Sequence, residues 1–154
     1  MMTRALLAAA CLFFGSRALS AQSLSRLSSP LPLWADSALV KAGFWGSYDL
    51  SSRVSPEIAF GDLDGDGLWD VAIAVVDKGG RRRGFVIVHQ IDRSVHVVGA
   101  GQPLGHGSDQ FPSDASWGLD ALSRYRAAVR VVDWHASGWV IWNGRDYVWV
   151  QDSF

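Results

Sequence analysis

The sequence predicts an all-β fold of two small antiparallel β-meanders, arranged as in a propeller blade or a sandwich and joined by a long loop. Glu57 is the only glutamate among 15 acidic residues, and 16 glycines are present. Helices favour glutamate and lysine, whereas aspartate and glycine favour turns. From Ile58 onward, β-branched runs alternate with turn residues, as in successive short strands. Asn143-Gly144 lies between two aromatic-rich runs, which is a strong hairpin signal.

The first 21 residues predict an export signal. Arg4 precedes an apolar run over residues 5–15, and small residues up to Ala21 offer a cleavage site. The run is shorter than the roughly 20 residues that span a bilayer as a helix. Loss of residues 1–21 would remove Cys11, the single cysteine, and would leave a mildly acidic chain without disulfides. We therefore expect a secreted or periplasmic protein with no transmembrane segment after signal removal.

Residues 22–33, rich in serine, leucine and proline, predict a flexible leader. A single β domain is expected over residues 34–154. It would begin with a short helix over residues 34–42, which ends near Gly43.

Three strands are expected in the first meander, at residues 71–76, 84–90 and 95–98. The first of them is apolar on both faces, as in a central strand. Residues 99–120, rich in glycine, proline, serine and aspartate, are expected to form the long loop. The second meander would hold a strand at residues 127–133 and a hairpin at residues 139–150 with a two-residue type I′ turn.

One acidic segment carries recognisable metal chemistry, the pattern D-x-D-x-D-G-x-x-D at residues 62–70. Ca²⁺ takes about 6–8 oxygen ligands, and alternate side chains of a tight loop can converge on one ion. Gly67 would permit the sharp turn, Leu68 would offer its carbonyl oxygen, and Asp70 would close the site directly or through water. The alternative is a surface turn without a metal. The predicted ligands of a bound Ca²⁺ are Asp62, Asp64, Asp66, Leu68 and Asp70.

The residues around this segment indicate the kind of calcium loop. Position 12 of an EF-hand loop is a glutamate on a helix, but here that position is Ile73. Ile73 belongs to an apolar, β-branched run, so the loop is predicted to lead into a strand. With Phe60-Gly61 before it, the segment 58–76 resembles the FG-GAP/VCBS-type repeat, also seen in integrin α-chain propellers. The resemblance implies a calcium loop between strands. A single copy departs from the propeller pattern, and residues 137–147 also resemble the tail of small secreted bacterial proteins that carry one such loop.

The sequence favours a binding or scaffolding module of the cell envelope, with structural calcium and a protein or glycan partner, over an enzyme. A net charge of −1 argues against a nucleic-acid partner. One alternative is a small envelope hydrolase that uses His106, Asp109 and Asp114 in the 99–120 loop, near two serines, although co-occurrence alone does not make a triad.

A second alternative is a carbohydrate-binding module. Aromatic faces can stack on sugar rings, and the predicted hairpin carries Trp139, Trp142 and Trp149. The histidines show no metal-ligand spacing, and we interpret His89 and His96 as ordinary strand or turn residues.

Overall fold

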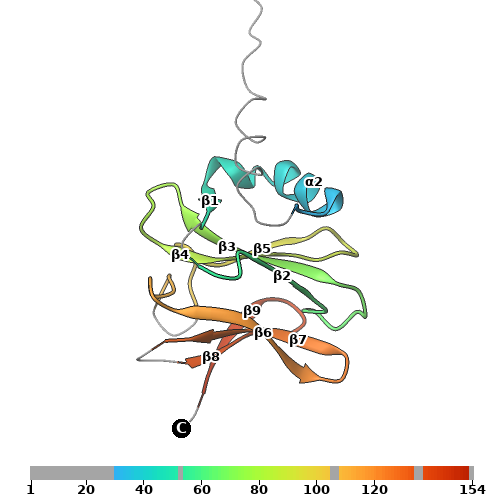
Figure 1. Ribbon diagram of the computed structural model, residues 1–154. Coiled ribbons are helices and arrows are strands. Elements are labelled where there is room, and N and C mark those ends of the chain that lie inside the picture. The colour runs from blue at the N-terminus through green and yellow to red at the C-terminus, as the bar shows by residue number, and fades with distance from the viewer. Residues whose placement is uncertain (1–29, 52–53, 105–107, 134–136, 153–154) are drawn as a thin grey trace, which may run out of the picture.

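Two antiparallel sheets and a short helical segment are stacked in three layers in the computed structural model (Figure 1). The structure describes residues 30–51, 54–104, 108–133 and 137–152. The predicted export signal and most of the predicted leader lie outside these residues. Within the described ranges, no helix has the length and apolar character needed to cross a membrane.

The first sheet has five strands with β3 at its centre. β3 pairs with β4 on one side, and on the other side β1 pairs with residues 75–77 while β2 pairs with residues 70–73. The predicted central strand is therefore confirmed. The strands are β1 (Tyr48–Leu50), β2 (Ile58–Gly61), β3 (Asp70–Asp77), β4 (Arg83–Val88) and β5 (Val95–Gly99).

The second sheet is a meander of four strands that follow one another in sequence order. The predicted loop over residues 99–120 is wrong at its end, because residues 116–120 belong to the first of these strands. In that strand Trp117 is buried and Leu119 packs against the core, so apolar and other residues alternate. Gly118 and Asp120 between and after them are typical turn residues, which made this short stretch resemble a loop. The strands are β6 (Ser116–Ser123), β7 (Arg126–Val132), β8 (Ser137–Trp142) and β9 (Tyr147–Gln151).

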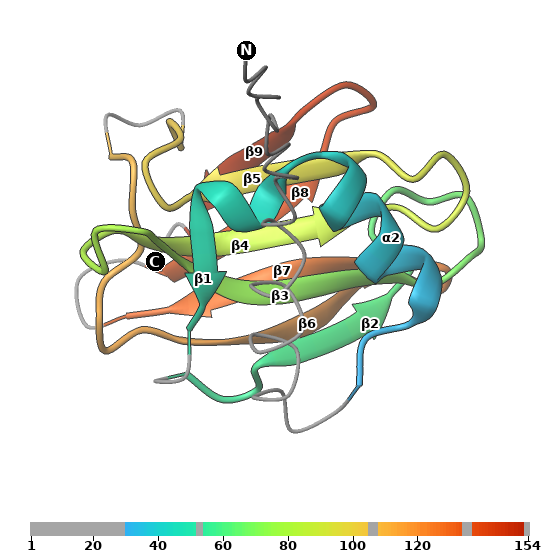
Figure 2. The same ribbon diagram turned by 90° about the horizontal axis from the view of Figure 1, so that it is seen from above.

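The helix α2 (Leu33–Lys41) covers the outer face of the first sheet (Figure 2). It begins one residue inside the predicted leader, and Gly43 follows its end with a φ of 66°, as a left-handed C′ residue. The short 3₁₀ helix η1 (Phe44–Gly46) then leads into β1. Ala35, Ala38 and Leu39 of α2 are buried against this face.

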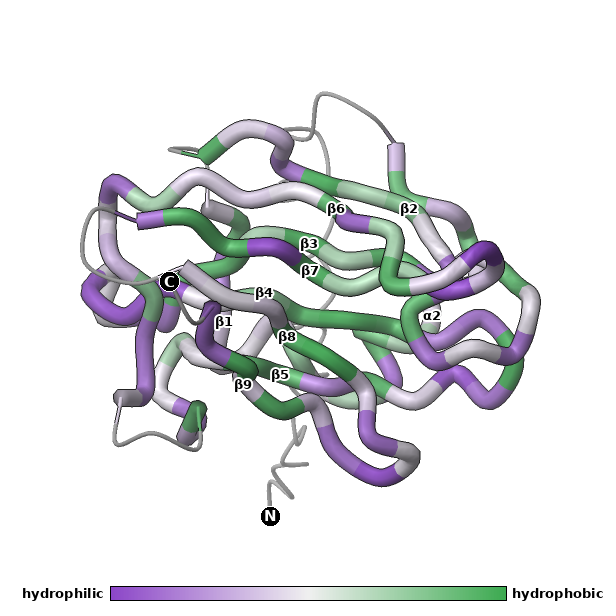
Figure 3. Tube along the Cα trace, turned by 90° about the horizontal axis from the view of Figure 1, so that it is seen from below, coloured by the Kyte–Doolittle hydropathy of each residue, from purple (hydrophilic) through white to green (hydrophobic). Residues whose placement is uncertain are grey.

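The first sheet is buried on both faces. Val71, Ile73 and Val75 of β3 pack in the cluster beneath α2, while Ala72 and Ala74 pack in the cluster shared with the second sheet. Hydrophobic residues accordingly concentrate along the strands, and hydrophilic residues in the connections (Figure 3). The two meanders thus pack as a sandwich across a common core.

The predicted type I′ turn in the last hairpin is wrong. A type I′ turn needs positive φ at both Asn143 and Gly144, but only Gly144, at 99°, has it. Asn143 instead accepts hydrogen bonds at Oδ1 from the backbone N–H groups of Arg145 and Asp146, each at 2.9 Å. The Asn143 side chain therefore closes the turn, and of the two residues only Gly144 has a positive φ.

Truncation of Leu39 tests whether α2 is part of the core. Leu39 is fully buried, so Leu39→Ala should lower the free energy of unfolding by about 2–5 kcal/mol. The neighbouring Val40 is 52% exposed, and Val40→Ala should change it by less than about 0.5 kcal/mol. Urea denaturation followed by tryptophan fluorescence measures both. Equal effects of the two variants would contradict the packing of α2 on the sheet.

Candidate metal centre

The predicted metal loop connects β2 to β3, and we call residues 62–69 the acidic loop. Its base is closed by the pairing of Gly61 with Asp70 in adjacent antiparallel strands. Carboxylate oxygens of Asp62, Asp64 and Asp66 lie within 4.8 Å of one another. The structure therefore brings together three of the five predicted ligand residues, at a separation that one ion could bridge.

Backbone N–H groups of the acidic loop fold it around its own carboxylates. Asp62 accepts from Gly65 N at 2.6 Å and from Gly67 N at 2.9 Å. Asp64 Oδ1 accepts from Asp66 N at 3.0 Å. Gly65 and Gly67 have φ values of 92° and 89°, which strain any residue with a Cβ. The glycine that the sequence motif requires at Gly67 is therefore a backbone requirement of this turn.

Asp70 lies beneath the loop and is fully buried. Its Oδ2 accepts from the N–H groups of Leu63 (2.9 Å) and Asp64 (3.3 Å), and its Oδ1 accepts from Gln90 N (2.9 Å). Burial raises the pKa of Asp70, although the N–H groups of Gln90 and Leu63 oppose this shift. A carboxylate has about four lone-pair sites, so these three bonds leave room for one more partner.

The fifth predicted ligand, Leu68, stands on the exposed outer part of the loop. Its N–H donates to Asp66 Oδ1 at 2.7 Å, so the peptide before Leu68 is fixed within the loop. Ligation through its carbonyl oxygen stays a prediction.

His89, predicted to be an ordinary strand or turn residue, lies at this site. It follows directly after β4 and is 2% exposed, and its Nδ1 is 3.4 Å from Asp64 Oδ2. Together Asp64, Asp70 and His89 form a second group whose ligand atoms lie within 4.8 Å of one another. No spacing rule could have found it, because His89 is brought to the loop by the pairing of β3 with β4.

A polar network continues from His89 to the second sheet. His89 Nε2 is hydrogen-bonded to the Tyr147 hydroxyl at 2.7 Å, and its Nδ1 lies 3.1 Å from Ser94 Oγ. His96 Nε2 bonds the same serine at 2.9 Å, and the Trp142 ring packs edge-on against both imidazoles. Burial raises the pKa of Tyr147, and the charges of Asp70 and Asp64 add to the shift, so its hydroxyl stays protonated.

The acidic loop is also attached to β7. Ala127 N donates to the backbone oxygen of Asp62 at 2.7 Å. The Arg126 side chain passes close to Gly65, where a Cβ would lie 3.5 Å from Arg126 Cδ, and donates to the backbone oxygen of Trp142. The loop thus joins the two sheets.

The chemistry of the donors decides what the site could hold. Three carboxylates in one turn provide oxygen atoms, which hard cations such as Ca²⁺ prefer. The group with His89 offers one nitrogen beside two carboxylates, a set that suits Zn²⁺ or a similar ion better. In that group, however, both imidazole nitrogens already have hydrogen-bond partners, and each ring nitrogen has a single site. A loop carboxylate oxygen that accepts one N–H keeps a second lone pair for a cation. The loop carboxylates are therefore the better candidate cation site.

The residues proposed for a hydrolase do not form a site among the described residues. His106 lies outside them. Asp109 is 3.2 Å from Arg82 Nη1, to which it is ion-paired. Asp114 lines a separate hollow of about 300 Å³ with Ser116 and residues 132–133.

The three tryptophans of the last hairpin are half-buried and each contacts another side chain. Trp139 lies under the Arg130 guanidinium at 4.1 Å, Trp142 packs on the imidazoles, and Trp149 packs on Phe111. These contacts favour a packing role over a sugar-binding role for the hairpin. Trp69, in the acidic loop, is instead 68% exposed.

Comparisons of the chain with models of known protein families, with curated proteins and with solved structures gave no match.

Two glycines separate backbone strain from side-chain volume. Gly67→Ala should lower the free energy of unfolding by about 1–2 kcal/mol, because alanine resists a φ of 89°. A Cβ at Gly67 would meet no atom within 4 Å, and the same is true of Gly118 in β6. Gly118→Ala should therefore leave stability unchanged or raise it slightly. Chemical denaturation measures both, and a Gly67→Ala variant as stable as wild type would exclude this loop conformation.

Removal of one oxygen tests the link between His89 and the second sheet. Tyr147→Phe should cost about 1–3 kcal/mol, since it leaves a buried imidazole nitrogen without its partner. Tyr125 is 74% exposed, and Tyr125→Phe should change stability by less than about 0.5 kcal/mol. Thermal or urea unfolding reports both values. If Tyr147→Phe matches Tyr125→Phe, the hydrogen bond does not support the fold.

Proposed function

We propose that the protein is a secreted calcium-binding β domain, which serves as a binding or scaffolding module of the cell envelope. The observation that carries the proposal is the convergence of the Asp62, Asp64 and Asp66 carboxylates in a tight loop between two strands. Export rests on the predicted signal at residues 1–21. Residues 58–76 resemble an FG-GAP/VCBS-type repeat, which implies a calcium loop between two strands, and the acidic loop lies between β2 and β3.

The proposed role of the calcium is structural. Carboxylates held this close repel one another, and a divalent cation would turn the repulsion into attraction. The loop that would hold the ion is bonded to Ala127 of β7 through Asp62 and to Gln90 through Asp70. An ion that stiffens the loop would therefore stiffen the junction of the two sheets.

Linkage gives the size of the expected effect. Extracellular calcium modules bind with a Kd of about 10⁻⁴–10⁻³ M. At calcium about tenfold above Kd, binding to the folded state adds about 1.4 kcal/mol to the free energy of unfolding. That amount stabilises a small domain usefully without making its folding depend on the metal.

Calcium should raise the melting temperature, and Asp66→Ala should abolish the rise. About 1 mM Ca²⁺ against a chelator should shift Tm upward by about 4–7 °C in the wild-type protein. Asp66 is exposed, and its Oδ1 accepts from Leu68 N within the loop, so its replacement should cost the metal-free fold only about 1 kcal/mol. Asp146→Ala removes a carboxylate outside the loop and should keep the full shift. Differential scanning calorimetry with and without the ion measures each value.

The identity of the metal is tested in the same experiment. Mg²⁺ at equal concentration should shift Tm less, because it demands a tighter octahedral geometry. A shift with Zn²⁺ that is absent with Ca²⁺ would assign the metal to the group containing His89 instead. An unchanged melting temperature with all three ions would refute the metal-binding proposal.

A further inference from the structure

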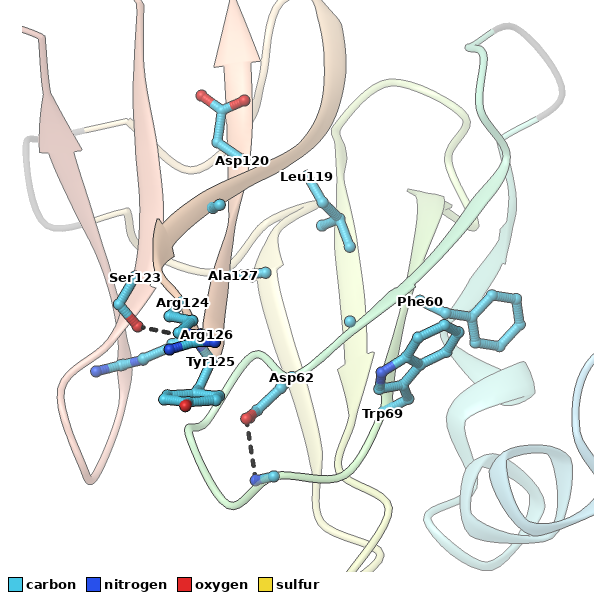
Figure 4. Close-up of a pocket in the computed structure, with 13 residues that line it drawn as sticks. Phe60, Asp62, Trp69, Leu119, Asp120, Ser123, Arg124, Tyr125, Arg126 and Ala127 are labelled. Carbon is cyan, nitrogen blue, oxygen red and sulfur yellow. Dashed lines mark hydrogen bonds between the residues drawn. The ribbon is translucent and has the colours of Figure 1, made fainter.

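A groove of about 410 Å³ runs beside the acidic loop (Figure 4). One wall is formed by β2 and the loop, and the other by β6 and the turn that joins β6 to β7. The strands β2 and β6 are edge strands of their sheets in the described part of the chain. The floor is apolar, formed by Gly61, Leu119 and Ala127. A Cβ at Gly61 would lie 2.9 Å from Leu119 Cδ1, so the absence of a side chain there permits the close approach of the two walls.

Aromatic rings border the groove on both sides. Trp69 and Phe60 lie on one side and Tyr125 on the other, with Asp62 between them in Figure 4. Trp69 is 68% exposed and Tyr125 is 74% exposed, so most of their apolar surface faces water. Large exposed rings that gather at a concave surface are typical of a binding site.

Polar side chains of both charges complete the lining. Asp62 supplies a carboxylate, and Arg124 and Arg126 supply guanidinium groups. Ser123 adds a hydroxyl beside them. The Asp120 carboxylate instead turns away from the groove and accepts a hydrogen bond from Trp139 Nε1 at 3.2 Å. A lining with charges of both signs does not select a polyanion or a polycation. It offers planar donors and acceptors to a neutral ligand that is itself rich in hydroxyls.

We propose that this groove binds a neutral oligosaccharide. A pyranose ring presents an apolar C–H face and a rim of hydroxyls, each of which can donate and accept a hydrogen bond. The exposed rings of Trp69 and Tyr125 match the faces. Ser123 and Arg124 match the rim, with the Arg124 guanidinium 5.6 Å from the centre of the Tyr125 ring. The volume falls in the range of pockets that hold small ligands. The inference rests on the binding role proposed above and names its class of ligand.

The test uses the full secreted chain and four neutral probes: cellotetraose, maltotetraose, chitotetraose and mannotetraose. Isothermal titration up to about 10 mM sugar should show saturable binding of at least one. Trp69→Ala and Tyr125→Ala should each weaken that binding about tenfold or more, whereas Trp69→Phe should retain most of it. Ile91→Ala removes a side chain that is 62% exposed but outside the groove, and it should bind as wild type.

Several results would overturn the proposal. They are the absence of binding by all four sugars, and sugar binding that survives both alanine substitutions. A third is binding of a short peptide of alternating valine and threonine in place of the sugars, which would assign the groove to strand addition on β2. Thermal melts confirm that each variant is folded.

Titrations in calcium and in chelator separate this proposal from the metal site. Sugar binding without any effect of calcium on Tm would contradict the metal proposal and support the groove proposal. A calcium-dependent Tm without sugar binding would support the metal proposal and contradict the groove proposal.

Discussion

The buried carboxylate of Asp70 fixes the position of the acidic loop. It accepts backbone N–H groups from the loop at Leu63 and Asp64 and from Gln90 beyond the end of β4. A buried carboxylate and a buried N–H are both costly without hydrogen-bond partners. These bonds therefore hold the acidic loop close to the segment that follows β4. His89 precedes Gln90 and is thereby placed beside Asp64. Asp70 therefore anchors the candidate metal centre, while the hydrogen bonds within the loop and the pairing of β3 with β4 set the rest of its geometry.

Hydrogen bonds from the same region also reach the second sheet. His89 meets Tyr147 of β9, and the backbone oxygen of Asp62 meets Ala127 of β7. The two sheets share a core of aliphatic and aromatic side chains, but such packing is non-directional. Hydrogen bonds with fixed partners supply the direction, since they are satisfied in one relative position of the sheets. The acidic loop and the histidine network thus supply the directional polar contacts between two sheets that otherwise meet through apolar side chains.

Local patterns in the sequence predicted the parts of the fold that depend on local chemistry. The apolar run of β3 predicted a central strand because burial on both faces removes alternation. The D-x-D-x-D-G pattern predicted a turn with converging carboxylates because spacing within one loop decides it. His89 and Tyr147 are 58 residues apart, so their contact depends on strand pairing and sheet packing. β6 was missed because its alternation is short, and the type I′ turn was wrong because the Asn143 side chain competes with the backbone.

The candidate metal centre and the groove share one segment, so binding at one would be coupled to binding at the other. Asp62 belongs to the carboxylate group of the acidic loop and also lines the groove. Trp69 stands between Leu68 and Asp70, so a cation that orders the loop also orders the ring that would stack on a sugar. Any gain in sugar affinity caused by calcium must be matched by an equal gain in calcium affinity caused by the sugar, because the coupling free energy is reciprocal.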